Sequence, residues 1–304
     1  MSTNRIWRLP RPLDAALAEV AAETETMLDR LLPFVEGAEA RIYEAMRYAT
    51  LGGGKRLRPF LVAASSELFQ VSHVAALRVG AALECIHTYS LVHDDLPCMD
   101  DDDMRRGKPT VHRQYDEATA VLAGDGLLTF AFEILGHADT HDDPRVRAEL
   151  VLRLARCAGA RGMVGGQMID LEAPRAVLDL GAITRLQQLK TGALIDFGCE
   201  AGAIMGHAGA EARHALHLYS RDLGLAFQIA DDLLDVEGTA EETGKAVGKD
   251  ADAGKATFVS ILGAERARLQ ARLLAEQAAG HLDLFDDRAD LLRALAAFVV
   301  ERRS

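Results

Sequence analysis

Residues 91–107 read "LVHDDLPCMDDDDMRRG" and place six aspartates within ten positions, followed at once by two arginines and a glycine. Adjacent carboxylates in water repel one another, so the stretch contributes nothing to folding unless positive charge lies among them. Carboxylates at a helix C-terminus also face the negative end of the helix dipole, which costs a few tenths to ~1 kcal/mol apiece at exposed sites. The motif therefore predicts a bound cation.

The sequence before the motif is apolar and typical of a helix, which we expect to begin near residue 74. Pro97 disfavours helical geometry in the residue before it, so the helix should end near Asp94 and Asp95. A loop then lets Asp100 return towards Asp94, a position that an uninterrupted helix would not allow.

A second acidic stretch, "AFQIADDLLDVEG", occupies residues 226–238. Asp231 and Asp235 are four residues apart and share one helical face, a like-charge pair that costs roughly 0.2–0.5 kcal/mol when solvated and more among apolar neighbours. Two aspartate clusters on apolar helices favour metal binding over a merely solvated acidic face. Ligand sets made only of oxygen suit Mg²⁺ or Mn²⁺.

The rest of the chain indicates an all-α protein. Its 304 residues are 49% hydrophobic but only 5% aromatic, apolar positions recur at helical spacing, and hairpin signals are nearly absent. Segments rich in glycine and proline, which interrupt helices, divide the chain into about ten helices. The sequence shows no linker and no repeat, so we predict a single domain over residues 1–304 whose site lies between facing helices. The segment 121–135 reads as a fully buried central helix.

Charge and composition limit partners and location. A net charge of −12 argues against binding to nucleic acid or anionic membranes. No segment reaches the roughly 18 uncharged apolar residues of a spanning helix, and the N-terminus lacks an export signal. Four widely spaced cysteines read as reduced thiols, so we expect a cytoplasmic protein without stable membrane insertion.

Basic residues follow Gly- or Asp-rich segments at several places, as expected where a phosphate-bearing substrate binds. The stretch "GGGKRLRP" (52–59) puts three of them at a turn into a helix, where free backbone N–H groups also attract anions. The full set is Lys55, Arg56, Arg58, Arg105, Arg106, Lys190, Lys245, Lys249 and Lys255. Together with the acidic motifs they predict a polyphosphate substrate.

Five motifs, "GGGKRLRP", "DDLPCMD…RRG", "KTGALI", "FQIADDLLD" and a later "GK…GK", occur in the order seen in the trans-isoprenyl diphosphate synthases. The resemblance runs from about residue 40 to 260 and is strongest to the bacterial short-chain farnesyl diphosphate synthases. It implies an isoprenoid synthase fold, an all-α bundle around a central active-site cavity, and a homodimer. It also implies that isopentenyl diphosphate attacks the carbocation formed from an allylic diphosphate, either dimethylallyl or geranyl, giving farnesyl diphosphate and pyrophosphate.

The resemblance carries roles onto individual residues. Mg²⁺, with Mn²⁺ as the alternative, is implied to be held by Asp94, Asp100 and Asp231. The implied catalytic set is Asp94, Asp95, Asp100, Arg105, Lys190, Asp231, Asp232 and Asp235. The allylic diphosphate is matched by Arg105, Lys190 and Lys245, isopentenyl diphosphate by Lys55, Arg58, His87 and Arg106, the reaction centre by Thr191 and Gln228, and a late basic contact by Lys255. Gln167 and Asp170 also match the family, although a helix cap explains them nearly as well.

Product length is predicted to depend on Tyr89 and Ser90. Tyr89 lies five residues, about 7.5 Å of helix rise, before Asp94, and in the related synthases an aromatic there goes with a fifteen-carbon product. Helical rotation places Ser90 more directly beneath Asp94, and Tyr89 packing in the core is the alternative.

Other functions remain open at this point. A geranylgeranyl diphosphate synthase of the same family is the first alternative. A terpene cyclase would share the first acidic motif but normally lacks "DDLLD", and a calcium buffer would need the Gly and terminal Glu of an EF-hand loop. His214 and His217 have no acidic partner nearby in sequence and read as surface residues.

Overall fold

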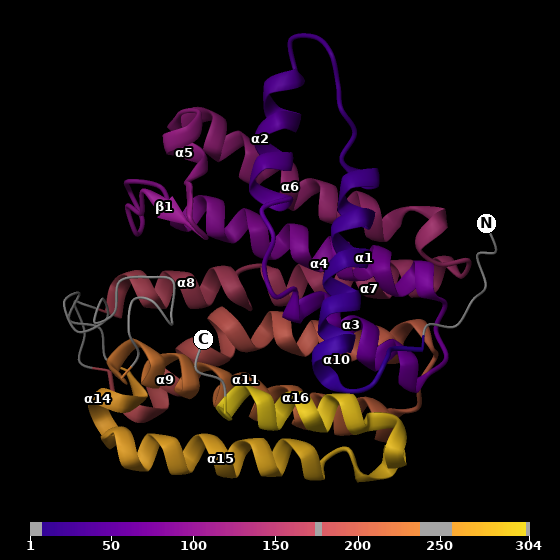
Figure 1. Ribbon diagram of the computed structural model, residues 1–304, viewed down its shortest axis with the longest axis vertical. Coiled ribbons are helices and arrows are strands. Elements are labelled where there is room, and N and C mark those ends of the chain that lie inside the picture. Colours follow the sequence, from indigo (N-terminus) through magenta and orange to yellow (C-terminus); the bar gives the residue numbers. More distant parts are fainter. Residues whose placement is uncertain (1–7, 174–177, 238–256, 302–304) are drawn as a thin grey trace. The chain divides into compact units, whose positions relative to one another are not determined.

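A computed structural model of the chain describes residues 8–173, 178–237 and 257–301 (Figure 1). These residues form helices joined by short connections, with one hairpin of two-residue strands between residues 104 and 109. The predicted all-α fold is confirmed, and the small hairpin is an addition that no strand-like run indicated.

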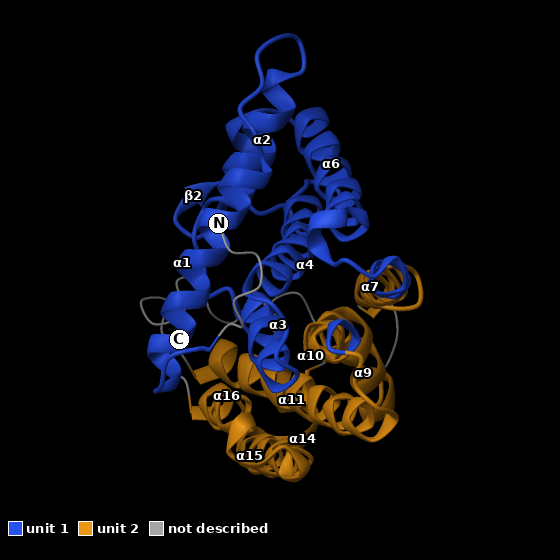
Figure 2. Cartoon of the chain, turned by 90° about the vertical axis from the view of Figure 1, so that its right-hand side faces the viewer, with its two compact units in different colours: residues 1–152, 204–206 blue, residues 153–203, 207–304 orange. Residues whose placement is uncertain are grey.

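The chain divides into two compact units (Figure 2). Unit 1 comprises residues 1–152 and 204–206, and unit 2 comprises residues 153–203 and 207–304. Two helices, α7 (Pro144–Ala158) and α10 (Ala193–Met205), contribute residues to both units. A single domain over residues 1–304 stays a prediction.

Unit 1 is built on α4 (His73–Asp94), which is buried along most of its length. The Ser72 side chain caps its first turn by accepting a hydrogen bond from the Ala75 backbone N–H at 3.2 Å. Helix α4 packs against four others, α1, α2, α3 and α6. The elements of unit 1 besides α4 are α1 (Leu13–Leu31), α2 (Ala40–Thr50), α3 (Leu57–Leu68), β1 (Met104–Arg105), β2 (Lys108–Pro109), α5 (Val111–Gln114), α6 (Glu117–Gly136) and η1 (Ala138–Thr140).

Helix α6 differs from its prediction as a fully buried helix. One face, with Leu127 and Ala131, is buried, whereas Val121 and Leu122 on the other face are 41% and 56% exposed. The chain alone therefore leaves an apolar surface on α6. Among the described helices, only α6 is long and apolar enough to cross a membrane. That test rests on length and composition, and the core helix of a soluble protein passes it too.

Unit 2 is built on α11 (Ala210–Glu237), which is 28 residues long. Helices α15 and α16, which follow α11 in the sequence, run alongside it (Figure 1). The earlier element η3, a single turn of π-helix, also packs against α11. The remaining elements are α8 (Met163–Glu172), α9 (Leu180–Gln187), η3 (Gln188–Gly192), α14 (Phe258–Leu262), α15 (Ala264–Gly280), η4 (Asp283–Ala289) and α16 (Asp290–Glu301).

Candidate active site

The first acidic motif begins where α4 ends. The helix ends at Asp94, as predicted from Pro97, and Asp95 is its C-cap. The chain then turns back, and the backbone N–H of Asp100 donates a hydrogen bond to the Asp94 carbonyl at 2.8 Å. The loop thus returns Asp100 to the end of the helix, which is the arrangement expected if the two carboxylates share cations.

Asp95 and Arg105 form one buried pair. Asp95 is 2% exposed and accepts hydrogen bonds from Arg105 Nε at 2.9 Å and Arg105 Nη2 at 2.6 Å. Burial raises the pKa of Asp95 above its ordinary value, and the hydrogen bonds and charge of Arg105 oppose that rise. Asp95 therefore fixes the Arg105 guanidinium beside the motif.

The hairpin directs Arg106, the second arginine of the motif, away from Asp95 and towards the Gly-rich loop at residues 52–54. Arg106 (φ 51°) and Gly107 (φ 75°) form the turn between β1 and β2, a geometry that requires positive φ at both residues. The Arg106 guanidinium donates to the carbonyl of Gly53. A Cβ on Gly54 would lie 2.8 Å from Arg106 Cζ, so the Gly-rich loop leaves room for this contact.

This contact brings together two of the segments that resemblance assigned to isopentenyl diphosphate. Lys55 follows the Gly-rich loop and is exposed, whereas Arg58 and His87 are half-buried. Burial, followed by the positive charges of Arg58 and Arg106, lowers the pKa of His87 well below its ordinary value. His87 is therefore neutral at neutral pH and lies in a positive field, the setting in which an arriving diphosphate is favoured.

Arg56 differs from the expectation that it attracts an anion with its neighbours. It is 3% exposed, and its guanidinium pairs with Glu84 and Glu25, each at 2.6 Å, and donates to the Thr50 carbonyl at 2.6 Å. Arg56 instead ties α1 to α4. Its spacing resembles that of Lys55 and Arg58, and no local signal in the sequence shows that its partners lie in other helices.

Tyr89 and Ser90 line the stretch of α4 before the motif. Tyr89 is 6% exposed and its ring stacks edge to face on His93, with ring centroids 5.8 Å apart. His93 Nε2 in turn lies 3.0 Å from the Val121 carbonyl, and a Cβ on Gly124 would come within 2.0 Å of that nitrogen. Sequence reasoning did not single out His93 or Gly124, which together hold the Tyr89 ring in place.

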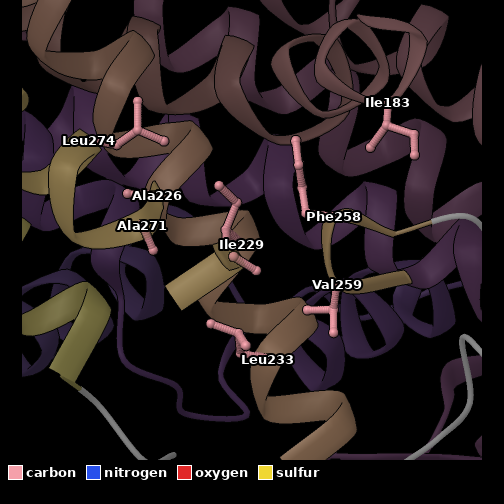
Figure 3. Close-up of a cluster of buried hydrophobic side chains, with 9 residues drawn as sticks. Ile183, Ala226, Ile229, Leu233, Phe258, Val259, Ala271 and Leu274 are labelled. Atoms are coloured by element: carbon pink, nitrogen blue, oxygen red, sulfur yellow. The ribbon is translucent and has the colours of Figure 1, made fainter. Parts of the chain in front are cut away.

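The second acidic motif lies on one face of α11 in unit 2. Asp231 and Asp235 are half-buried on that face. The opposite face, with Ala226, Ile229 and Leu233, packs into a buried apolar cluster (Figure 3). That packing fixes the rotation of α11, so the two aspartates point away from the cluster.

Asp232, between the two, is 3% exposed. Its carboxylate accepts hydrogen bonds from Gln228 Nε2 and from the Phe258 backbone N–H, each at 2.9 Å. Thr191 Oγ1 donates to Gln228 Oε1 at 3.3 Å. The place of these two residues at the reaction centre stays a prediction. The contacts of Asp232 indicate that it holds Gln228 and the start of α14 in position. Its catalytic role stays a prediction.

Lys190 lies in η3, where the π-helical turn interrupts regular helix, a feature frequent at functional sites. Lys190 Nζ pairs with Asp170 at 2.7 Å. A Cβ on Gly166 would lie 2.3 Å from the Lys190 backbone nitrogen, so this glycine sets the close approach of α8 and η3. Gln167 on α8 has a buried Nε2 without a hydrogen-bond partner among the described residues.

The described residues suit Mg²⁺ by the chemistry of their donors. Asp94 and Asp100 in unit 1 and Asp231 in unit 2 offer only carboxylate oxygen, and Arg105 is already paired with Asp95. Within the described residues no three His, Cys, Asp or Glu side chains form a preassembled metal site. Mg²⁺ usually completes its coordination with oxygens of water and of a phosphate substrate.

All four cysteines are free thiols, as predicted. His217 is exposed, as predicted, but it does have an acidic partner, because its Nδ1 lies 2.9 Å from Asp196. Lys245, Lys249 and Lys255 lie outside the described residues.

Comparison with known proteins agrees with the geometry. The polyprenyl synthetase family profile matches residues 39–294, which extends beyond the region of motif resemblance. The farnesyl diphosphate synthase of Escherichia coli (strain K12) is 42% identical over 96% of this chain and 98% of that protein. The crystal structure of an FPP/GFPP synthase from Zymomonas mobilis is 53% identical with a TM-score of 0.86, covering 95% of this chain and 98% of that one. The structure of a geranyltransferase from Helicobacter pylori, complexed with magnesium and isoprenyl diphosphate, is 32% identical with a TM-score of 0.82, covering 97% and 98%. The chain belongs to the polyprenyl synthetase family.

Proposed function

We propose that the protein is a farnesyl diphosphate synthase, a trans-prenyltransferase that condenses isopentenyl diphosphate with dimethylallyl and then geranyl diphosphate and releases pyrophosphate. The observation that carries the proposal is the fold-back of Asp100 onto Asp94 beside the Asp95–Arg105 pair. It presents carboxylates and a fixed guanidinium at one helix end. The relative named farnesyl diphosphate synthase in Escherichia coli supports the product.

Mg²⁺ is the proposed metal, with Mn²⁺ as the alternative, and Asp94, Asp100 and Asp231 would hold it. When bound, the metal supplies Lewis-acid stabilisation of the negative charge on the leaving pyrophosphate. The Helicobacter pylori relative was crystallised with magnesium and isoprenyl diphosphate, which supports this assignment. Asp235 completes the second motif on the same face of α11.

The basic residues bind and orient the two diphosphates. Arg105 and Lys190, each paired with an aspartate, would bind the allylic diphosphate, because the pairing keeps the cation in position before substrate arrives. Lys55, Arg58, Arg106 and the neutral His87 would bind isopentenyl diphosphate. Thr191 and Gln228 are proposed to face the reaction centre, and Lys245 and Lys255 keep their predicted roles as diphosphate contacts.

Tyr89 supports a fifteen-carbon product. Its ring is buried and fixed by His93, so it can limit the length of a growing tail that runs along α4. The Zymomonas mobilis relative is described as an FPP/GFPP synthase, a name that includes a longer product. Geranylgeranyl diphosphate therefore remains the alternative product.

The experiment is to incubate the purified chain with Mg²⁺, isopentenyl diphosphate and each allylic primer, and to size the dephosphorylated alcohols. We expect farnesol as the main alcohol from dimethylallyl and from geranyl diphosphate. A main product of twenty carbons would overturn the farnesyl assignment and favour the alternative. No condensation with any primer would overturn the function itself.

We further propose that the chain acts as a cytoplasmic homodimer without membrane insertion. The exposed Val121 and Leu122 on α6 support a second copy as their cover, since an apolar surface of this kind favours burial. Sedimentation should report a dimer, and Leu122→Lys should shift it towards monomer. A monomer for the unmodified chain at working concentration would contradict this proposal.

A further inference from the structure

Unit 2 contains a cavity lined by arginines that the proposed catalysis does not use. Its volume is about 610 Å³, and its lining includes five arginines from four segments of the chain. Arg153 and Arg156 come from α7, Arg161 from the connection to α8, Arg185 from α9 and Arg221 from α11. The tertiary fold therefore gathers these residues, which show no motif in the sequence.

Only one of the five is neutralised by carboxylates. Arg153 pairs with Asp196 and Glu200. The other four are exposed and form no ion pair within the described ranges. The chain has 46 acidic and 34 basic residues, so carboxylate partners are in excess overall. Arginines left together without partners repel one another, and a bound anion would relieve that repulsion.

The cavity faces away from the catalytic residues of the same segment. Gln188, Gly192 and Asp196 recur at helical spacing along η3 and α10 and line the cavity. Lys190 and Thr191, between them, instead contact Asp170 and Gln228. The arginine cavity and the proposed allylic diphosphate site therefore lie on different faces of this helical segment.

The inner wall of the cavity is already organised. Asp196 accepts hydrogen bonds from Arg153 and from Ser220, and lies 2.9 Å from His217 Nδ1. Cys157 and Leu225 add apolar surface to the lining. The wall is thus a paired, fixed layer, and the four other arginines surround it with donors that have no carboxylate partner in the part of the chain that the structure describes.

We propose that this cavity binds a small soluble ligand that carries two or more phosphate groups. The planar guanidinium fork matches phosphate oxygens in bidentate fashion, and several such groups together favour a multiply charged ligand over a single phosphate. The volume lies within the roughly 300–1,000 Å³ of small-molecule sites. Since the arginines supply the positive charge, binding requires no divalent cation, in contrast to the catalytic diphosphates.

The test is calorimetric titration of the full-length protein with inorganic tripolyphosphate in excess EDTA at low salt. We expect one site whose affinity falls as salt rises, because the contacts join charged groups. In the double variant Arg156→Gln, Arg221→Gln the affinity should fall about tenfold or more, because two charge-assisted contacts to phosphate are lost. Arg266→Gln, an exposed arginine on α15, and Arg58→Gln, in the catalytic region, should retain this site.

Unchanged affinity in the double variant, or no binding in EDTA, would overturn the proposal. Loss of the site in Arg58→Gln would also overturn it, since binding would then belong to the catalytic region. Phosphate groups are also present on lipid headgroups, and sedimentation with phosphatidylglycerol vesicles tests whether the cavity binds those instead. If the vesicles retain the protein through Arg156 and Arg221, the site binds lipid headgroups and the soluble-ligand proposal fails. Unfolding curves of each variant show that the fold is kept.

Discussion

Neighbouring aspartates in each motif have different environments. Asp95 and Asp232 are buried and paired with protein donors, whereas Asp94 and Asp231 are half-buried at the motif face. One residue along a helix rotates a side chain by about 100°, which separates the two environments. The sequence predicted the motifs but could not show which carboxylate turns inward, because the partners, Arg105 and Phe258, are set by tertiary contacts.

Replacing Tyr89 tests the limit on product length. Tyr89→Ala should give products of twenty carbons or more with condensation retained, because removing the ring opens space along α4. Tyr89→Phe keeps the ring and should keep the fifteen-carbon product. Chromatography of the alcohols measures both, and an unchanged fifteen-carbon distribution in Tyr89→Ala would show that another residue limits the chain.

The two substrate sites can be separated kinetically. His87→Ala and Arg58→Ala should raise the KM for isopentenyl diphosphate by about tenfold, the effect of one charge-assisted hydrogen bond. Lys190→Ala should raise the KM for the allylic substrate instead. Initial rates with each substrate varied in turn give both constants. Equal effects on the two substrates in all three variants would refute the partition.

At the scale of elements, the end of α4 was predictable and its surroundings were not. Pro97 marks the end of the helix in the sequence, and the structure ends it at Asp94. The hairpin at residues 104–109 is too short for an alternating pattern, and it depends on positive φ at Arg106 and Gly107. The π-helical turn around Lys190 likewise has no signature in hydrophobic periodicity, because it adds a single wide turn to a helix.

The contact of α8 with η3 depends on Gly166. Gly166→Ala should lower the free energy of unfolding by about 1–3 kcal/mol, because the added Cβ meets backbone that has to shift. It should also lower turnover, since Lys190 moves with that backbone. In the control Gly181→Ala, on α9, the added Cβ meets only Asp179 Oδ1 at 3.4 Å, and Ala is the better helix former.

Denaturant unfolding and steady-state rates compare the two variants. The control should unfold at the same or a higher denaturant concentration than the unmodified protein. Wild-type stability and turnover in Gly166→Ala would show that α8 and η3 do not need their close approach.

At the scale of the whole molecule, the order of motifs predicted the family and the all-α class, and both are confirmed. Burial was less predictable. The sequence of α6 carries few charges, so it could not show that Val121 and Leu122 remain exposed in one chain. The contact of His217 with Asp196 and the arginine cavity join residues far apart in sequence, which periodicity does not detect.

The central claim is that the two acidic motifs hold divalent cations for the condensation, and turnover against free Mg²⁺ tests it most directly. We predict no turnover in excess chelator and full recovery when Mg²⁺ is restored. Asp94→Asn and Asp231→Asn should each lower turnover about a hundredfold or more, since metal stabilisation of developing charge contributes several kcal/mol. The exposed control Asp142→Asn should keep the wild-type rate. Full turnover in chelator, or wild-type rates in both motif variants, would contradict the account.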